Sequence, residues 1–443
     1  MGLFKKKTIA KSQVDLQQFF LSRMIGSNPV ILYDYNREDF ISKGYSSNAE
    51  IYAIIKKITD KCNVSTPYVY IDNKAVKGQK YLTTQKAKNS ILNVCKHRIE
   101  VHKSLDYAPE DNDLSKLLKN PNSTQTWREF ITLFRIFYFV QGEAFIFRSA
   151  GKNNCALSLH IVPSHSMQSI ISEGQIVAWK YDKMDGFVKT FSVEDVLHFK
   201  MPNPTFDNSY SQYRGMSPLM AGLKYLQLDD KAVISWIKSI ENEGAKGIVS
   251  PNHPNPELWL TEDQVINVQE QIELKIHGSE NRNKISVSGM PLQYTHIGLS
   301  PEALNIIEGL KYANVKLCDL WGVPGVLFES NPTYQNQKEA GKRFVLDVVL
   351  PYLNNEEDKL NTWLVEPFNI RDSRNYVIDY DLSAYDELRL DQSAVETMLK
   401  THSINEVRVM QGSDERDEPY ANEVMIPQGM VPLSDYNVTD IEV

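Results

Sequence analysis

Residues 217–243 carry the longest uninterrupted helical pattern of the chain, and a helix of that length constrains the fold most strongly. Ser217 is a good N-cap residue, and Pro218 stands at the first helical position. About 27 residues at 1.5 Å each give a rod roughly 40 Å long. Apolar residues form one narrow seam with polar flanks and a polar Asp230 in its course: Leu219, Leu223, Leu226, Val233, Ile237 and Ile240. A single-chain core favours a broader apolar face, so we expect neighbouring subunits to complete the burial.

A second rod is expected at residues 301–321. Ser300 and Pro301 supply an N-cap and a first helical residue, and the pattern breaks at residues 322–325, where two glycines flank Val323 and Pro324. The apolar residues again recur at helical spacing: Ala303, Ile306, Leu310, Ala313, Leu317 and Leu320. Two rods separated by a small insertion are therefore the framework that the sequence predicts.

A polar loop and another helix follow the second rod. The loop spans about residues 329–337, is small and polar, and has no apolar face. The helix after it places Phe344, Val345, Val348, Val349 and Tyr352 on one side. Pro351 lies inside this helical pattern and is expected to kink it. Trp321, Tyr352 and Trp363 are expected to pack in a core or between subunits.

The remaining periodicities predict an α+β chain. Residues 1–45 are expected to be poorly ordered or extended. Residues 49–62 form an amphipathic helix with Tyr52, Ile55 and Cys62 on one stripe, and helices are also expected at residues 87–102 and 127–140. Strands are expected at residues 68–71, 144–147, 157–162, 166–171, 176–181 and 196–199.

The insertion between the rods, residues 244–298, predicts a small α/β unit. Its expected strands are residues 247–250, 285–287 and 292–294, and Thr261 with Gln264 forms a capping box before a helix. Beyond the long helix we expect a strand at residues 376–380 and a helix at residues 388–400. Ser403 and Glu406 then make a second capping box.

Bulk properties exclude several classes of protein. The chain of 443 residues has a net charge of −8, so as a whole it is no general DNA binder. No apolar run approaches 20 residues, which argues against a membrane span. The four cysteines are scattered without a Cys-x-x-Cys pair, as in a reduced compartment: Cys62, Cys95, Cys155 and Cys318.

A search for catalytic motifs finds no phosphate-binding loop. The spacing of His97, Glu100 and His102 fits no zinc motif, and His198 is expected to be a hydrogen-bonded structural histidine. Asp229 and Asp230 should point in different directions on their helix, which disfavours a two-metal nuclease. We therefore expect no catalytic residue, no metal and no cofactor.

Residues 77–103 form a basic segment in which Glu100 is the only acid. Its basic residues are Lys77, Lys80, Lys86, Lys88, Lys96, Arg98 and Lys103. Two interpretations remain open. The segment is either a solvated insertion on the rim of the body, or an electrostatic contact to DNA or to an acidic capsid or scaffold surface.

Short pieces in a fixed order give the chain a family resemblance. They are Asn48-Ala49-Glu50-Ile51-Tyr52-Ala53-Ile54-Ile55, Pro121-Asn122, Thr126-Trp127, Gly142-Glu143-Ala144-Phe145, Val196-Leu197-His198-Phe199, Gly215-Met216-Ser217-Pro218-Leu219, Leu299-Ser300-Pro301, Gly322-Val323-Pro324 and Thr333-Tyr334-Gln335-Asn336. With this order the chain resembles tailed-bacteriophage portal proteins of the siphophage type, over nearly its whole length. These proteins form the ring at one capsid vertex through which DNA is packaged and ejected.

The resemblance implies a portal fold with eight consecutive parts. They are an N-terminal arm (1–45), an α/β wing (46–216), stem helix 1 (217–243), a small α/β clip (244–298), stem helix 2 (299–325), a tunnel loop (326–338), a kinked long helix with the wing's return strand (339–382), and a helical crown with the C-terminal tail (383–443). It also implies a ring subunit that is not an enzyme.

The resemblance assigns DNA contact to the tunnel loop, whose polar side chains can bond phosphate oxygens without reading sequence. The residues expected there are Asn331, Thr333, Tyr334, Gln335 and Asn336, with Lys338 and Lys342 as a modest attractive ring. The alternative is a solvent-exposed helix connection. The expected contact residues for docking at the clip are His253, Asn255, Glu257, Trp259 and Arg282.

The implied partners are other copies of the chain, twelve in the virion, and double-stranded DNA without sequence specificity. Further partners are the terminase large subunit, which hydrolyses the ATP, a neck adaptor, and the major capsid or scaffold protein; no membrane is implied. Twelve copies carry about −96 in net charge, twelve times −8, which keeps a duplex centred if the acids face inward. The expected location is the virion, with the host cytoplasm during assembly. The rivals are another ring or adaptor protein of the virion neck and, less favoured, a nucleic-acid-processing enzyme.

Overall fold

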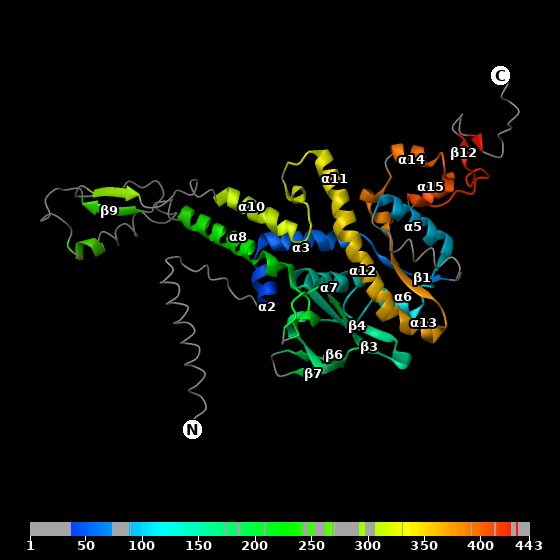
Figure 1. Cartoon of the computed structure of the whole chain (residues 1–443), viewed down its shortest axis with the longest axis horizontal. Coiled ribbons are helices and arrows are strands. Elements are labelled where there is room, and N and C mark those ends of the chain that lie inside the picture. Colours follow the sequence, from blue (N-terminus) through cyan, green and yellow to red (C-terminus); the bar gives the residue numbers. More distant parts are fainter. Residues whose placement is uncertain are drawn as a thin grey trace, which may run out of the picture. The chain divides into compact units, whose positions relative to one another are not determined.

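The computed structural model, shown in Figure 1, describes residues 37–72, 88, 90–172, 175–183, 187–207, 210–241, 247–251, 261, 263–267, 270, 292–296, 306–329, 331–390, 392–411, 413–426 and 431–432. Residues 37–45, expected to be extended or poorly ordered, are instead helical: α2 (Arg37–Asp39) is followed by the π turn η1 (Phe40–Tyr45). Phe40 and Gly44 are buried there, because η1 packs against α7 and α8. The rest of the predicted arm lies outside the described residues.

The described residues confirm a mixed helix and sheet fold with small antiparallel sheets. One sheet has the order β11–β1–β2, from Tyr376–Tyr380, Pro67–Asp72 and Leu105–Tyr107. The second has the order β4–β3–β8, from Ala156–Val162, Glu143–Ala150 and Val196–Lys200. The third is β5–β6–β7, from Met167–Ser172, Gln175–Asp182 and Val188–Ser192, and β7 is a strand that the sequence reading missed.

Two further pairs of strands are short. β9 (Gly247–Pro251) pairs with β10 (Leu292–His296) in antiparallel register, so the two ends of the insertion are joined as a sheet. β12 (Met425–Ile426) pairs with β13 (Val431–Pro432) near the C-terminus. The expected strand at residues 285–287 lies outside the described residues.

The described helices match the predicted periodicities within a few residues at their ends, except for α6 (Asp113–Lys119) and α13 (Glu366–Asp372), which were not predicted. They are α3 (Ala49–Cys62), α5 (Ile91–Ser104), α6 (Asp113–Lys119), α7 (Trp127–Gln141), α8 (Pro218–Glu241), α10 (Ile306–Asp319), α11 (Tyr334–Phe344), α12 (Leu350–Leu360), α13 (Glu366–Asp372), α14 (Gln392–Met398) and α15 (Ile404–Met410). The capping box of Ser403 and Glu406 is present at α15. In α3 the buried stripe is Ile51, Ile54, Ile55, Ile58 and Cys62, while Tyr52 is exposed, so the predicted stripe was wrong at Tyr52.

Two aromatic clusters hold the body together. In the first, Tyr138 of α7 lies 4.6 Å from Phe199 of β8 between ring centroids, and Phe139 lies 4.8 Å from Tyr352 of α12. In the second, Phe145 of β3 meets Trp179 of β6 edge to face at 4.9 Å, which packs one three-stranded sheet on the other. As predicted, Tyr352 is therefore a core residue, and Trp321 is buried with its indole N–H donated to the carbonyl of Phe139.

One continuous helical run crosses the body from residue 334 to residue 372 (Figure 1). It contains two π turns, η8 (Val345–Val349) and η9 (Asn361–Val365), which lie just before Pro351 and Pro367. Proline has no N–H to continue the α-helical bonding, and the wider π turn accommodates that loss. The helix therefore continues through Pro351, and the kink expected there stays a prediction.

Candidate functional site: the paired helices and the polar segment

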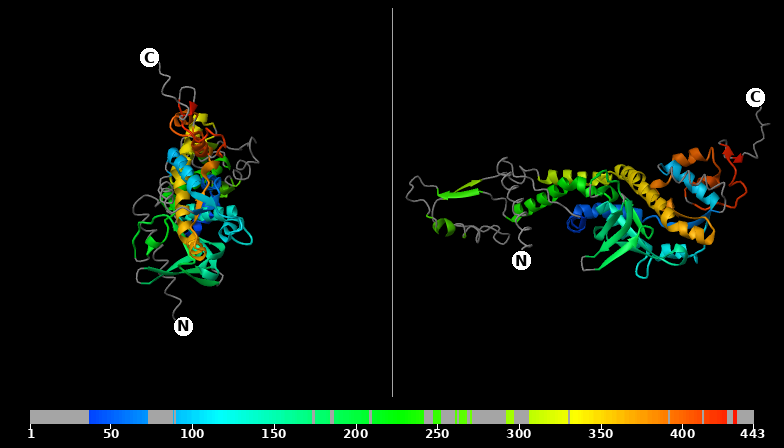
Figure 2. Two further views of the ribbon diagram at one scale, coloured as in Figure 1. Left: turned by 90° about the vertical axis from the view of Figure 1, so that its right-hand side faces the viewer. Right: turned by 60° about the horizontal axis from the view of Figure 1, so that its bottom comes forward.

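Helices α8 and α10 lie side by side (Figure 2) and run antiparallel. Gly222 of α8 leaves room for the side chain of Leu320, the residue after α10: a Cβ on Gly222 would stand 2.2 Å from a methyl group of Leu320. Further along, Tyr225 meets Tyr312 at 6.1 Å between ring centroids. The two rods predicted from periodicity thus form one pair, although residues 301–305 lie outside the described part.

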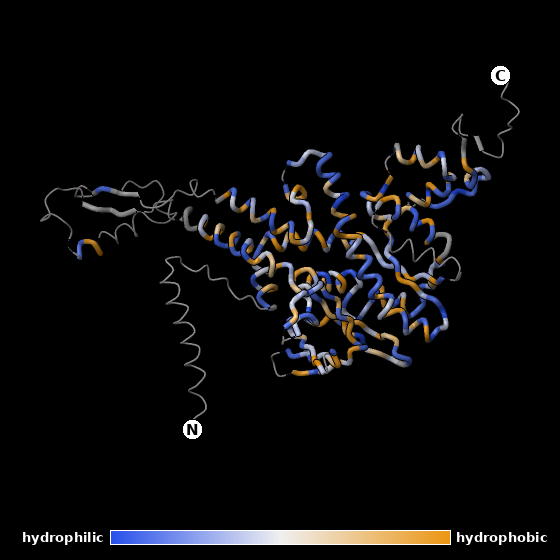
Figure 3. The backbone as a smooth tube through the Cα atoms, viewed as in Figure 1, coloured by the Kyte–Doolittle hydropathy of each residue, from blue (hydrophilic) through white to orange (hydrophobic). Residues whose placement is uncertain are grey.

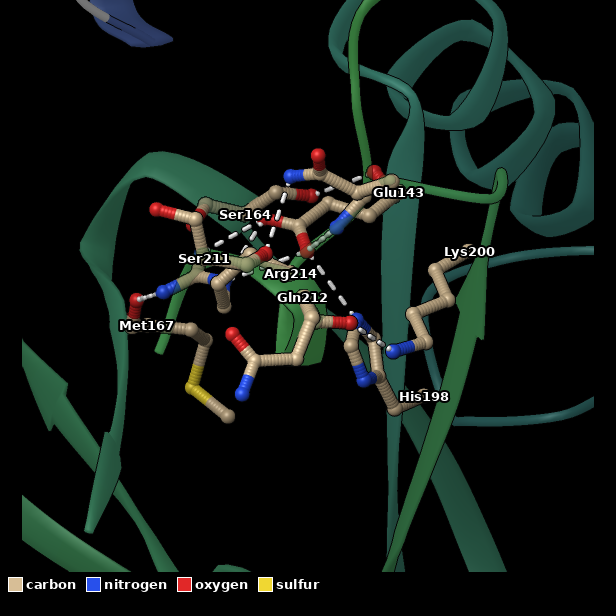
Figure 4. A network of polar contacts seen from close by, with 10 residues as sticks. Glu143, Ser164, Met167, His198, Lys200, Ser211, Gln212 and Arg214 are labelled. Carbon is tan, nitrogen blue, oxygen red and sulfur yellow. Dashed lines mark hydrogen bonds and ion pairs between the residues drawn. The ribbon is translucent and has the colours of Figure 1, made fainter. Parts of the chain in front are cut away.

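A buried carboxylate fixes the chain where it enters α8 (Figure 4). Glu143, the first residue of β3, is fully buried and accepts bonds from Arg214, from His198 Nε2 at 3.0 Å and from the N–H of Gly215 at 2.8 Å. Arg214 also donates to the carbonyls of Met167 (2.6 Å) and Ser164 (3.0 Å). One ion network therefore ties β3, β8 and the start of β5 to the base of α8.

His198 has the structural role expected of it. Burial lowers its pKa, and this effect outweighs the bond to Glu143, which favours the protonated ring. A ring that is buried, stacked on Phe145 at 4.4 Å and bonded to a carboxylate is held in one orientation. Glu143 and Arg214 were not predicted, because their pairing spans 71 residues of sequence.

Two glycines let the base of α8 touch the end of α7. Gly142 has φ of +76°, and a Cβ on it would lie 2.1 Å from the carbonyl oxygen of Met216. A Cβ on Gly215 would lie 2.1 Å from the carbonyl oxygen of Gly142. Ser217 caps α8 as predicted, accepting from the N–H of Leu219 at 3.1 Å, and it also donates to the carbonyl of Val140. No larger residue fits at these two glycines, so the helix base is fixed by backbone contact.

Asp229 and Asp230 of α8 share one partner, contrary to the prediction that they point apart. The side-chain amide of Asn48 donates to Asp229 at 2.8 Å and to Asp230 at 3.1 Å. Asn48 is the N-cap of α3, so the cap residue itself bridges both carboxylates. Burial raises the pKa of Asp230 and of nearby Glu50, and the charge of Asp229 raises both further. Within the described residues no group of acids, histidines or cysteines is arranged to hold a metal ion.

Apolar side chains remain exposed on the helix pair. Leu219 and Leu226 of α8 are completely buried, but Val233 and Ile237 on the same predicted seam are exposed. Figure 3 shows apolar residues alternating with polar ones along α8 and α10. The further exposed apolar residues are Met220, Leu228, Ile234 and Trp236 of α8, and Ile307, Tyr312 and Val315 of α10. The expectation that a second copy completes the burial of this pair stays a prediction.

The polar loop after α10 is shorter than predicted. Thr333 is an N-cap that accepts from the N–H of Asn336 at 3.4 Å, and α11 begins at Tyr334. The prediction of a loop through Gln337 was therefore wrong, and the Thr333 cap was the signal that marks the helix start. The residues expected to contact DNA are exposed, except for Lys342, which is partly exposed: Asn331, Thr333, Tyr334, Gln335, Asn336 and Lys338.

The residues expected at the clip lie outside the described part: His253, Asn255, Glu257, Trp259 and Arg282. The described residues of the insertion include β9, β10 and a helical stretch at residues 263–267. The N–H of Thr261 donates to Gln264 Oε1 at 3.1 Å, which confirms one half of the predicted capping box.

Part of the basic segment is internal, which contradicts both interpretations for the residues concerned. Lys88 is buried and pairs with Glu357 at 2.9 Å and with Asp379 at 3.2 Å, while His97 Nε2 lies 2.7 Å from Asp379. Arg98 donates to the carbonyls of Met410 and Leu382. The acids that neutralise Lys88 lie more than 260 residues away in sequence, so no local pattern reveals them. Lys77, Lys80 and Lys86 lie outside the described residues.

A second buried pair lies beside the first. Arg135 of α7 donates to both oxygens of Glu356, at 2.9 and 3.1 Å, and Tyr380 donates to the same carboxylate. Glu356 and Glu357 are neighbours on α12, and each meets a buried cation from a different part of the chain. These pairs join α12 to α7 and to Lys88, and Lys88 and His97 of α5 both meet Asp379 of β11.

Comparisons with known proteins agree with this architecture. The phage portal protein family model matches residues 93–412. The chain is similar to a chain in the neck of an empty gene transfer agent particle computed with C6 symmetry, with a TM-score of 0.58, 19% identity, and coverage of 86% of this chain and 95% of that one. It is similar to a chain in the neck of the native particle computed with C12 symmetry, with a TM-score of 0.56, 19% identity and the same coverage of 86% and 95%.

A third similar structure is a chain of the virion of the native gene transfer agent particle. The TM-score is 0.57 at 18% identity, with 89% of this chain and 98% of that chain covered. At such identities the likeness shows a shared fold. No curated protein sequence matches the chain. None of the described helices has the length and apolar content that crossing a lipid bilayer requires.

Proposed function

Because the chain belongs to the phage portal protein family, we propose that its copies form a ring through which double-stranded DNA passes during packaging and ejection. The family membership makes it a portal subunit of the capsid vertex, a structural component of the virion and not an enzyme. The observation that carries the ring is the exposed apolar surface of α8 and α10, which one chain leaves uncovered. Many exposed apolar side chains gathered on one pair of helices are typical of a protein interface.

Twelve copies are proposed for the ring. The support is the similarity to a chain of a particle neck computed with C12 symmetry. A rotational ring also requires two different faces on each subunit, one for each neighbour. The α8–α10 pair has such faces, because each helix has exposed residues of its own.

The polar segment from Asn331 to Lys342 is the proposed DNA contact. Its exposed amides and hydroxyls can bond phosphate oxygens of any sequence, and such neutral bonds break easily as the duplex slides. A ring of strong lysine–phosphate pairs would hold the DNA in place, and here Lys338 and Lys342 supply two cations for each subunit. Glu339 lies between them and tempers that attraction.

The insertion that begins at β9 and ends at β10 is the proposed docking part. We propose that it binds the terminase large subunit during packaging and a neck adaptor afterwards, with the major capsid or scaffold protein as a further partner. On this account the ring is assembled in the host cytoplasm and remains in the virion.

The DNA contact is tested by reversing charge on α11. We expect the double variant Lys338→Glu and Lys342→Glu to enter procapsids normally, because both side chains are at least partly exposed. It should package or retain less DNA, since each subunit then repels the duplex. The matched control is Lys116→Glu with Lys119→Glu, which changes the same charge on exposed lysines of α6. Normal DNA content in the α11 variant would remove this segment from the DNA path.

A further inference from the structure

One exposed stripe runs along α8 and combines apolar and positive side chains. Met220, Lys224, Leu228 and Lys231 follow each other at steps of four, four and three, which places them on one line of a helix. Met220 is 60% exposed and Leu228 is 41% exposed. Both lysines are exposed, and among the described residues neither forms an ion pair.

A second stripe runs along α10 and combines apolar and negative side chains, with Lys311 and Lys316 on its two flanks. Glu308, Tyr312, Val315 and Asp319 follow at steps of four, three and four. Tyr312 is 53% exposed and Val315 is 47% exposed. Asp319 meets Lys316 at 2.9 Å within the helix, but both side chains face water, so this pair contributes little and is easily exchanged.

The two stripes correspond in their positions along the helix axes, and their charges are of opposite sign. Gly222 abuts Leu320, and the helices run antiparallel. Counted from Gly222 and Leu320, Lys224 is level with about residue 318 and Lys231 with about residue 311; counted from Tyr225 and Tyr312, they are level with about residues 313 and 306. By either count Lys231 lies within about three residues of the level of Glu308, and by the first count Lys224 lies within about one residue of the level of Asp319. Leu228 falls level with residues 309–314, the stretch that contains Tyr312.

In a closed ring, the α8 stripe of one copy can contact the α10 stripe of the neighbouring copy. Neighbours in a closed ring are related by rotation without rise, so residues at equal height along the axis meet. We propose that the two rods run along the ring axis and that the α8 stripe of one copy packs on the α10 stripe of the next, with Lys224 facing Asp319 and Lys231 facing Glu308. This rests on the proposed ring. A two-fold dimer through the α8 stripe would instead bring the lysines against each other.

Charge reversal on each side, and on both, tests the pairing. The variants are Lys224→Glu with Lys231→Glu, Glu308→Lys with Asp319→Lys, and all four changes together. Native mass spectrometry over a concentration series gives the concentration at which rings form. Each one-sided reversal should raise that concentration at least about tenfold, and the fourfold variant should return toward the unchanged protein. Lys116→Glu with Lys119→Glu is the control. Equal ring formation by all variants, or no recovery in the fourfold variant, would overturn the pairing.

A crosslink gives a second readout that does not depend on ring yield. Leu228→Cys combined with Val315→Cys should form a disulfide between copies, while each single variant should not; the native cysteines among the described residues are buried. Absence of the crosslink in rings that do form would place the interface elsewhere and leave the portal function intact. Failure of the unchanged protein to form rings at all would count against the proposed ring itself.

Discussion

Glu143, Glu356 and Asp379 are carboxylates in the interior, and each is neutralised by a cation from a distant part of the chain. The charges of Lys88 and His97 hold the pKa of Asp379 well below its usual range, although burial opposes this. A buried charge without its partner costs several kcal/mol, so these residues act as fixed points of the structure. Two of the three lie on or against α12, and the third lies at the base of α8.

Removing the charge of Glu143 should therefore be costly. In Glu143→Gln the largely buried guanidinium of Arg214 loses its counterion, and we expect the free energy of unfolding to fall by about 3 kcal/mol. Denaturant titration measures this. Glu194→Gln, at an exposed position of the neighbouring turn, is the control and should change stability little. A loss below about 0.5 kcal/mol in Glu143→Gln would show that the network does not support the helix base.

The pH dependence of stability should report His198. Its pKa is lowered in the fold, so below about pH 6.5 the unfolded chain binds a proton that the folded chain does not. The contribution of His198 to the free energy of unfolding is therefore fully present above about pH 6.5, and it is lost as the pH falls toward the lowered pKa of His198 in the folded protein. We expect the His198→Gln variant to lack this loss when denaturant titrations are compared between pH 8 and pH 5. Parallel curves for the two proteins would contradict the account.

The sequence predicted that His198 is a hydrogen-bonded structural residue, but it did not predict that Lys88 is buried. The reason is physical. His198 stands in a strand pattern with apolar neighbours, so a satisfied core histidine is the natural expectation. Lys88 belongs to a run of lysines that looks solvated, and only Glu357 and Asp379, brought together by folding, show that it is buried. Pairing across hundreds of residues leaves no local periodicity to detect.

At the scale of elements, the run from α11 to α13 is anchored by asparagines. The side chain of Asn361, in the π turn η9, accepts from the N–H of Ile378 at 2.7 Å and donates to its carbonyl at 2.8 Å. Asn369 bonds the backbone of Tyr376 in the same two-sided way. β11 is an edge strand, so these side chains satisfy the backbone groups that no strand pairs.

In the Asn361→Ala variant, the N–H and the carbonyl of Ile378 in β11 should lose their hydrogen-bond partner. Loss of two hydrogen bonds to buried backbone predicts a fall of about 1–3 kcal/mol in the free energy of unfolding. Asn355→Ala, at an exposed position of α12, should cost a few tenths of a kcal/mol at most. Hydrogen exchange at the Ile378 amide should also speed up in Asn361→Ala. Unchanged exchange there would mean that the strand edge is satisfied in another way.

Helical periodicity predicted the long helices reliably, and it failed where a short segment departs from a regular apolar repeat. The rods of α8 and α10 were predicted because their apolar seams repeat over many turns. The predicted loop after these rods was too long. The residues after Thr333 are polar, and α11, which begins with them, has no apolar face in its first turns. β7 was missed because only Phe191 in it is buried. The π turns η8 and η9 were not predicted, although each precedes a proline.

At the scale of the whole molecule, the chain exposes apolar surface where a ring needs it. The family and the fold were both predicted from sequence, through short pieces in a fixed order and through the two rods around an insertion. The position of each subunit's neighbour was not predictable, because exposure along α8 and α10 depends on how the rods pack on α3 and α7. The ring is therefore the central claim that solution measurement has to decide.

The most direct test is the mass of the purified chain by native mass spectrometry, with imaging of the same sample by electron microscopy. The account predicts closed rings of about a dozen copies with a central hole, formed increasingly as the protein concentration rises. A closed two-fold dimer that buries the exposed faces of α8 and α10 would contradict it, as would a monomer that persists at all concentrations.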